Sequence, residues 1–275
     1  MESIADERLD TYYRLLEEGG RNPLPLPTAA GLSESLRRGR FSLERIARQA
    51  ESDPVFAFRL LALANSRVHG RPREGASIRE AVLMLPAKVL RNELLEEGPQ
   101  PLPELPDAWL NEFYRHAISV SRIAFAVAAR SEALQARAAE VRAAALLHDF
   151  GLYVMAVLEP VRFTEALRTA SAPGSISREN ERERFGLTHA DLGGVLSDLY
   201  QLPLCIEEAM LYHATPEVAY DRTLVEAVAV ADQAAHALET QTLQGEFALP
   251  LDPERIKRLG LTPEGFKAIL EHSGK

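Results

Sequence analysis

The most apolar part of the chain contains a histidine and a carboxylate side by side. His148 and Asp149 stand within the run from Ala143 to Met155, which otherwise has the composition of a protein core. An isolated ionised carboxylate is costly in such an environment, so it normally becomes protonated, pairs with a cation or binds a metal. A structural role is the plainer alternative, in which Asp149 accepts backbone hydrogen bonds and His148 is a hydrogen-bonded core histidine. The pair therefore indicates either a buried polar contact or part of a metal site.

Other residues of the same two types fall on or beside separate predicted helices, mostly among apolar neighbours: His116, His189, His213 and Asp232. Helices that converge in a bundle bring such residues together, and bundles build metal sites from imidazole and carboxylate side chains on facing helices. Nitrogen and oxygen ligands together suit iron, manganese, zinc or magnesium. The sequence therefore predicts a cluster of all six residues that either binds a divalent metal or forms a hydrogen-bonded core.

The remaining histidines and the single cysteine have plainer positions. His69 falls in a predicted loop, His236 fits a surface helix and His272 lies in the C-terminal tail. Cys205 fits a small buried side chain on a helix better than a nucleophile, because its neighbours are apolar. We assign none of these residues a chemical role.

The elements that must position the cluster are helices. Apolar residues recur with helical rather than alternating spacing, and Ala, Leu, Glu and Arg, all strong helix formers, fill the other positions. Cap signals such as Ser52-Asp53-Pro54 mark helix starts. The spacing predicts an all-α protein with helices near residues 5–18, 28–38, 42–50, 54–66, 77–96, 107–130, 137–157, 160–171, 188–200, 203–213, 222–240, 253–259 and 263–272.

A proline-rich stretch divides the chain. Residues 98–106 contain four prolines, and a segment so poor in backbone donors cannot be an interior helix or strand. We therefore predict an N-terminal helical subdomain at 1–97, a linker at 98–106 and a second helical subdomain at 107–240. The last part, 241–275, is expected to be a tail with short helices.

The composition excludes several classes of protein. The 275 residues are 46% hydrophobic and 26% charged, as in an ordinary soluble globular protein. The formal net charge is −9 and the basic run at 37–40 is short, so no nucleic acid partner is expected. The N-terminus is acidic where a secretory signal needs positive charge, and the apolar stretches are short or interrupted by charges. We predict a cytoplasmic protein without a membrane-spanning helix.

The sequence resembles a known family. The order His116, His148-Asp149, Asp232 is similar to the H…HD…D pattern of the HD superfamily of metal-dependent phosphohydrolases. The finer resemblance is to the HDOD domain, a relative found in bacterial signal-transduction proteins, and it covers residues 22–240. The motifs that carry it are Leu24-Pro25-Leu26-Pro27, Ser52-Asp53-Pro54, Leu63-Ala64-Asn65-Ser66, Leu147-His148-Asp149-Phe150-Gly151 and the run from Glu183 to Gly193. The resemblance implies an N-terminal helical bundle followed by an HD-like helical bundle.

The resemblance also implies roles for the cluster. His116, His148, Asp149 and Asp232 match the metal positions of the superfamily, and His189 and His213 match histidines added in the HD-GYP phosphodiesterases, which use a multinuclear metal centre. The sequence departs from those enzymes where their lysine after His-Asp-x-Gly is Leu152, where their His-His-Glu reads His213-Ala214-Thr215, and where no Gly-Tyr-Pro follows. Loss of the lysine removes a cation that would hold a substrate phosphate.

Two functions are weighed on this basis, and no catalytic residue is assigned. The first is a non-enzymatic regulatory module of bacterial signal transduction that binds a signalling protein partner or a small ligand such as a nucleotide. The alternative is a metal-dependent phosphohydrolase or cyclic-dinucleotide phosphodiesterase, in which Asp149 bridges two metals. A third, plainer alternative is a hydrogen-bonded core with all function on the surface. We favour the first.

Overall fold

The computed structural model describes residues 2–18, 42–68, 71–90, 104–170, 176–241 and 252–273. Within these ranges every regular element is helical and no β-strand occurs. The all-α prediction is confirmed. The elements are, in chain order, α1 (Glu2–Glu18), α3 (Leu43–Ala50), α4 (Pro54–Asn65), α5 (Ile78–Met84), α7 (Asp107–Ala128), the 3-10 turn η1 (Gln135–Arg137), α8 (Ala138–Leu147), α9 (Phe150–Leu158), α10 (Pro160–Thr169), α11 (Arg178–Phe185), α12 (His189–Leu199), α13 (Leu204–Tyr212), the 3-10 turn η2 (Pro216–Val218), α14 (Arg222–Gln241), α15 (Pro253–Arg258) and α16 (Pro263–Ser273).

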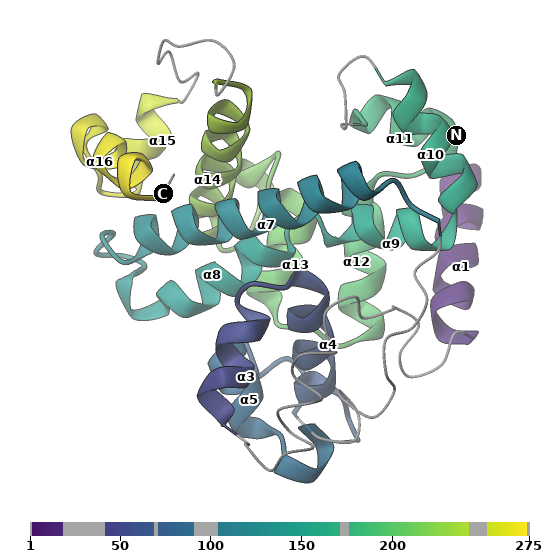
Figure 1. Cartoon of the computed structure of the whole chain (residues 1–275), viewed down its shortest axis with the longest axis horizontal. Helices are drawn as coiled ribbons and strands as arrows, with labels where there is room; N and C mark the ends of the chain where they lie inside the picture. The colour runs from purple at the N-terminus through teal and green to yellow at the C-terminus, as the bar shows by residue number, and fades with distance from the viewer. Residues whose placement is uncertain are drawn as a thin grey trace.

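The helices that follow residue 107 form the larger bundle. In it α7 packs along α8 and α14, α13 packs against α8, and α12 packs against α9 and α13 (Figure 1). Their facing sides are apolar, and Val120, Leu146 and Val228 are buried. Burial of each such side chain contributes about 1.5–3 kcal/mol, so hydrophobic packing holds these helices together.

Helices α3, α4 and α5 form a smaller group at the bottom of Figure 1. Nearly every residue of α4 is buried, so it is the central helix of this group. Its N-terminus is capped by Asp53, whose Oδ1 accepts hydrogen bonds from the backbone N–H of Val55 and of Phe56, each at 3.0 Å. The ring of Phe58 stacks on Phe150 of α9 with centroids 4.3 Å apart, so α4 also joins the smaller group to the larger bundle.

The first helix packs on the larger bundle, although it begins the chain. In Figure 1 α1 lies beside α12. Arg8 Nε donates a hydrogen bond to the carbonyl of Phe185, and both Arg8 and the Tyr12 hydroxyl pair with the carboxylate of Glu159. The predicted boundaries at 97 and 98 lie outside the described residues, as do the helix expected at 28–38 and His69, so the division into subdomains stays a prediction.

Two expected helices are each interrupted. The helix expected at 77–96 ends at Met84, because Leu85 is extended (ψ 131°) and precedes Pro86, and the residue before a proline is disfavoured in the α conformation. Residues 87–90 are helical again. The helix expected at 137–157 is two helices, α8 and α9, which meet at His148 and Asp149.

Helix α11 was not predicted from the sequence. The residue spacing predicts no helix at residues 172–187. Its sequence is strongly polar and has no apolar periodicity. Local signals were nevertheless present. Ser177 Oγ accepts a hydrogen bond from the Asn180 N–H at the start, and Gly186 ends the helix with a φ of 80°, a left-handed conformation that favours glycine.

One stretch is apolar enough to cross a membrane by length and composition alone. It runs from Gln135 to Leu158, and 72% of its most apolar 18-residue window is buried inside the protein. Such burial is what the core helix of a soluble protein shows.

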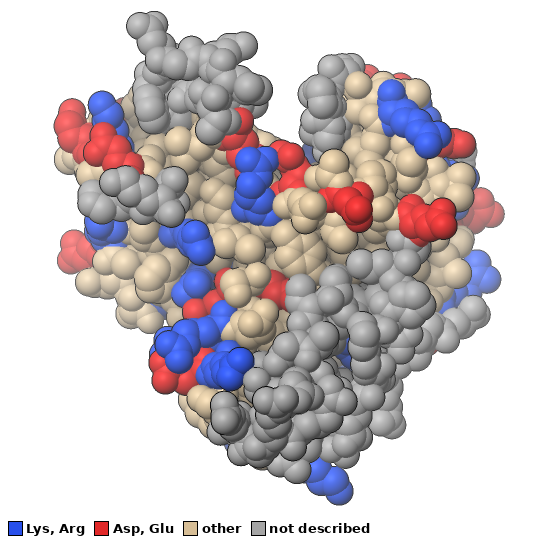
Figure 2. Space-filling model, in the orientation of Figure 1, with Lys and Arg blue, Asp and Glu red and all other residues tan. Residues whose placement is uncertain are grey.

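Charges of both signs are mixed on the surface. On the face drawn in Figure 2, the basic and acidic side chains of the described residues are interspersed, and neither sign forms a continuous area. The described residues of this face therefore form no broad positive area, in line with the net charge of −9.

Candidate metal centre

The break between α8 and α9 places His148 and Asp149 inside the larger bundle. His148 is buried, and its Nδ1 is 2.8 Å from the carbonyl oxygen of Ala145. A carbonyl only accepts hydrogen bonds, so Nδ1 carries a hydrogen and Nε2 is the nitrogen left to face the cluster. Such an outer hydrogen bond fixes the orientation and tautomer of a metal-ligating histidine.

The histidines of α12 and α13 are oriented in the same way. Nδ1 of His213 is 2.9 Å from the carbonyl oxygen of Ala209, one turn earlier in α13. Nδ1 of His189 is 2.8 Å from Oε1 of Glu181, and the backbone N–H of His189 donates to Oε2 of the same carboxylate at 2.8 Å. Both rings therefore present Nε2 to the interior of the cluster.

Asp149 lies at the centre, with its two carboxylate oxygens facing different pairs of histidines. Oδ1 is 3.3 Å from Nε2 of His213 and 3.4 Å from Nε2 of His189. Oδ2 is 3.4 Å from Nε2 of His148 and 3.8 Å from Nε2 of His116. Asp149 is therefore shared by two groups of ligand-type atoms. We call the group at Oδ2 the first half of the cluster and the group at Oδ1 the second half.

Asp232 completes the first half from α14. Its Oδ1 is 3.1 Å from Nε2 of His116 and 3.6 Å from Nε2 of His148. All six residues expected from the sequence thus converge: His116, His148, Asp149, His189, His213 and Asp232. The prediction that separate helices bring them together is correct.

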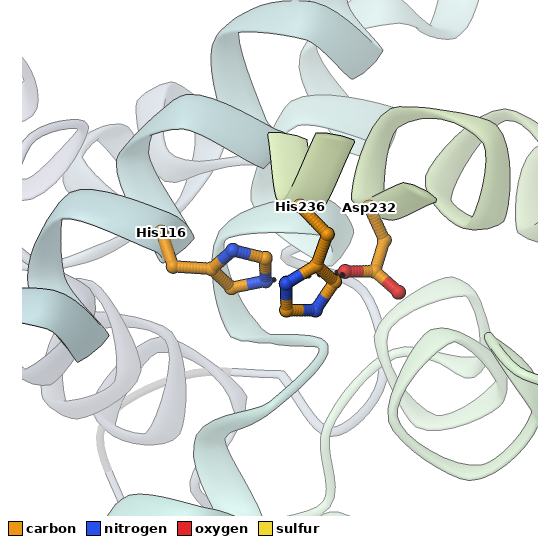
Figure 3. Close-up of side chains that lie close together, drawn as sticks. All are labelled: His116, Asp232 and His236. Atoms are coloured by element: carbon orange, nitrogen blue, oxygen red, sulfur yellow. Dashed lines mark ion pairs between the residues drawn. The ribbon is translucent and has the colours of Figure 1, made fainter. Parts of the chain in front are cut away.

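His236 adjoins the first half, although the sequence suggested no role for it. It lies on α14 one turn after Asp232 and is 58% exposed, so its expected surface position is confirmed. Figure 3 shows its ring beside that of His116, and the ring centroids are 4.3 Å apart. Its Nε2 is 3.3 Å from Oδ1 of Asp232, so three ligand-type side chains meet here.

Two residues of α11 reach the second half and were missed together with that helix. Glu181 is fully buried and holds His189, as described above. Arg178 places Nη2 2.9 Å from Nε2 of His213 and 3.5 Å from Nε2 of His189. No apolar pattern marks either residue, because α11 is polar along its whole length.

A glycine sets the position of the second half. A Cβ added to Gly151 on α9 would lie 2.0 Å from the carbonyl oxygen of His189 and 3.2 Å from the backbone nitrogen of Gly193. Only glycine permits this approach of α9 to α12. The approach brings His189 within reach of Asp149, two residues before Gly151.

The charges of the cluster outweigh the effect of burial on most of its titratable groups. Burial lowers the pKa of His116, but nearby carboxylates, chiefly Asp232, raise it to about 9. Burial raises the pKa of Asp149, but the surrounding histidines, chiefly His148, hold it well below its ordinary value. Burial lowers the pKa of His213 to about 3, so this imidazole is neutral at pH 7. Ionised carboxylates and neutral imidazoles are the forms that bind metals. With a pKa of about 9, His116 is protonated at pH 7, so an ion bound in the first half would have to displace its proton.

The first half contains buried polar atoms without a well-formed hydrogen bond. They are both ring nitrogens of His116, Nε2 of His148 and Oδ1 of Asp232. Most buried polar atoms in proteins are paired, and an exception calls for an explanation such as an ion. Ligand atoms about 2.1 Å from a common ion lie about 3.0–3.4 Å apart, close to the 3.1 Å and 3.6 Å found from Asp232 to these histidines. The residues therefore fit a divalent metal ion.

Fold and site together define a class: an all-α protein whose larger helical bundle encloses a cluster of histidines and aspartates. A model of the HDOD domain matches residues 23–216, which is more than half of the chain. The chain belongs to the HDOD domain family, as the sequence motifs predict. The match ends before α14, so Asp232 and His236 lie outside the matched region.

Solved structures have the same fold. The MmoQ response regulator from Methylococcus capsulatus str. Bath is 21% identical, with a TM-score of 0.71 over 90% of this chain and 96% of that one. A virulence factor from Campylobacter jejuni subsp. jejuni is 16% identical, with a TM-score of 0.65 over 96% of this chain and 99% of that one. No curated protein matches the chain. At these identities the likeness is one of fold.

Proposed function

We propose that the chain is a regulatory signal-transduction module whose His/Asp cluster binds a divalent metal ion and which binds a partner protein or a small ligand such as a nucleotide. Membership of the HDOD family supports the regulatory role. The observation that carries the metal is the position of Asp149, whose two oxygens each face a pair of histidine Nε2 atoms. The proposal includes neither a nucleic acid nor a membrane partner, and it places the module in the cytoplasm.

The ligand set favours certain metals. Imidazole nitrogen suits zinc and iron, whereas magnesium prefers oxygen ligands and keeps several waters. Four of the six predicted ligands are histidines. We therefore expect iron, zinc or manganese in preference to magnesium.

A regulatory role is favoured over catalysis by what surrounds the cluster. The position that carries a lysine in the resembling phosphodiesterases is Leu152, a partly buried side chain packed against the core. The cation that does approach the cluster, Arg178, directs Nη2 at His213 and His189. Neither residue offers the free cation that a phosphate substrate needs.

The alternative is a phosphohydrolase or phosphodiesterase, and the convergence of all six ligand-type residues favours it. A metal bound there would lower the pKa of a water molecule and polarise a phosphoryl oxygen. In that case His116, His148, Asp149 and Asp232 would hold the first metal, and Asp149, His189 and His213 the second.

Turnover assays separate the two functions. Metal-loaded protein is incubated with cyclic dinucleotides, nucleotides and generic phosphoesters, and the products are separated by chromatography. We expect no turnover, while calorimetry with the same compounds tests for binding of a small ligand. Turnover that is lost in Asp149→Ala and kept in Asp198→Ala, a change at an exposed residue of α12, would refute the regulatory proposal and establish the alternative.

A further inference from the structure

Helix α11 is attached to the cluster by two residues of one face. Arg178 is the first residue of the helix and Glu181 lies one turn later, and side chains at this spacing point the same way. Glu181 holds the ring and backbone of His189, so the helix is fixed next to the second half. The guanidinium of Arg178 is thereby brought to the Nε2 atoms of His189 and His213.

The contact between Arg178 and His213 uses the lone pair that a metal would need. Nδ1 of His213 donates to the Ala209 carbonyl, so Nε2 is the acceptor, and Arg178 Nη2 lies 2.9 Å from it. A guanidinium stays protonated in proteins and only donates hydrogen bonds. One imidazole lone pair cannot accept this N–H and ligate a metal at the same time.

The guanidinium places a positive charge against the second half. Oδ1 of Asp149 lies 3.3–3.4 Å from the same two Nε2 atoms, so Arg178 and Asp149 contact the same pair of histidines. In the first half the Nε2 atoms of His116 and His148 are buried and lack such a donor. The two halves therefore differ, because the guanidinium of Arg178 contacts the histidines of the second half and, among the described residues, no such donor contacts those of the first half.

We propose that Arg178 is the built-in cation of the second half, so that the cluster takes one divalent ion, in the first half, rather than two. This inference rests on the proposed metal binding. It assigns to an arginine the place that a second metal has in a multinuclear centre. His189 and His213 then contact Arg178, and His116, His148, Asp232 and Asp149 Oδ2 would hold the ion.

Metal stoichiometry tests the inference directly. Untagged protein is stripped with a chelator, reloaded with Mn²⁺ and dialysed, and bound metal is counted by mass spectrometry and examined by electron paramagnetic resonance. We expect one Mn²⁺ per chain in the wild type, and two in Arg178→Gln with the spectrum of an exchange-coupled pair. Arg182→Gln removes the same charge from an exposed position of α11 and is expected to keep one. Circular dichroism and thermal unfolding confirm that each variant is folded.

A variant that cannot bind metal in the first half tests the second half separately. His116→Ala removes a ligand from the first half alone, so this variant is expected to bind no Mn²⁺, whereas the double variant with Arg178→Gln is expected to bind one. Two ions in the wild type, or no gain of an ion in both Arg178→Gln backgrounds, would refute the role of Arg178 and leave the metal proposal standing. A folded wild-type chain that takes up no metal would refute both.

Discussion

At the scale of single residues, the cluster is defined by hydrogen bonds that lie outside it. The Nδ1 atoms of His148 and His213 are bound to helix carbonyls, and that of His189 is bound to a carboxylate. Each ring is therefore held with Nε2 pointing inward before any ion arrives. Preorganisation of this kind lowers the cost of binding, because the ligands need not be ordered by the metal.

Glu181 is predicted to stabilise the fold through His189. Glu181→Ala leaves the buried His189 ring and N–H without their acceptor, and loss of one partner of a buried pair costs about 3–5 kcal/mol. We expect a decrease of about 3 kcal/mol in the free energy of unfolding, measured by urea denaturation. Glu179→Ala, at an exposed position of the same helix, is the control and is expected to stay within about 0.5 kcal/mol. Equal effects of the two changes would contradict this role.

The residues that the sequence revealed are those that contrast with their surroundings. His148 and Asp149 are polar side chains in an apolar run, and this contrast predicts a buried polar site. Arg178 and Glu181 stand among other charged residues, so their polarity does not distinguish them from their neighbours in the sequence. His236 was placed on the surface correctly, but its contact with His116 depends on how α7 and α14 pack, which the local sequence does not specify.

At the scale of helices, the contact of α9 with α12 depends on Gly151. An added methyl group would meet the backbone of His189 at 2.0 Å, and backbone cannot move aside as a flexible side chain can. We expect Gly151→Ala to lower the free energy of unfolding by about 3 kcal/mol or more. Gly265→Ala near the start of α16 has only the Thr262 hydroxyl within 4 Å and is expected to change it by about 0.5 kcal/mol at most. Urea denaturation that ranked the two variants equally would refute the steric argument.

Asp53, at the N-terminus of α4, makes the stability of the folded protein depend on pH. Burial raises the pKa of Asp53 to about 6 from an ordinary 3.8, against the effect of the backbone N–H groups of Val55 and Phe56. The folded state therefore binds the proton more tightly than the unfolded state. The contribution of Asp53 to stability is full below about pH 4 and falls as the pH rises through about 6, by about 3 kcal/mol in total.

Asp53→Asn keeps a capping side chain but removes this titration. Relative to the wild type, the variant is expected to gain up to about 3 kcal/mol of stability between pH 4 and pH 7. Denaturation curves at a series of pH values measure this difference. Asp252→Asn alters an exposed cap of α15 and is the matched control, with no comparable gain expected. A difference for Asp53→Asn that does not change with pH would show that burial does not control this carboxyl group.

The helix boundaries show where local sequence is informative. The cap at Asp53 predicts the start of α4 correctly, because it acts through hydrogen bonds to the next few residues. Pro86 also marks the end of α5 in the sequence, because the residue before a proline is disfavoured in a helix, but the helix predicted at 77–96 runs through this proline. The break at His148 and Asp149 is not marked by a side-chain cap of α9.

At the scale of the whole molecule, α1 joins the start of the chain to the larger bundle. Tyr12 is buried on this helix and Leu15 is 42% exposed. We expect Tyr12→Ala to lower the free energy of unfolding by about 3 kcal/mol, since loss of a large buried side chain leaves a cavity. Leu15→Ala is expected to cost less than about 1 kcal/mol. A similar, small loss in both variants by urea denaturation would show that α1 adds little to the bundle.

The local sequence does not specify which helices contact one another. Residue spacing predicts that α1 is a helix, but its hydrogen-bond partners, the Phe185 carbonyl and the Glu159 carboxylate, lie 177 and 147 residues away from Arg8 and Tyr12 along the chain. The resemblance to the HDOD family predicts the overall fold, and the family match and the solved structures agree with it. It does not specify how α11 meets the cluster, because that contact depends on residues outside the motifs.

The claim on which this account depends is that the His/Asp cluster binds a metal ion. The most direct test is the metal content of the chain purified without a histidine tag, measured by inductively coupled plasma mass spectrometry. The account predicts a stoichiometric divalent metal in the wild type and its loss in His148→Ala, with Cys205→Ala, a change at a buried residue that belongs to none of the candidate ligand groups, unaffected. A folded wild-type chain that carries no metal and takes none up from iron, manganese or zinc would contradict it.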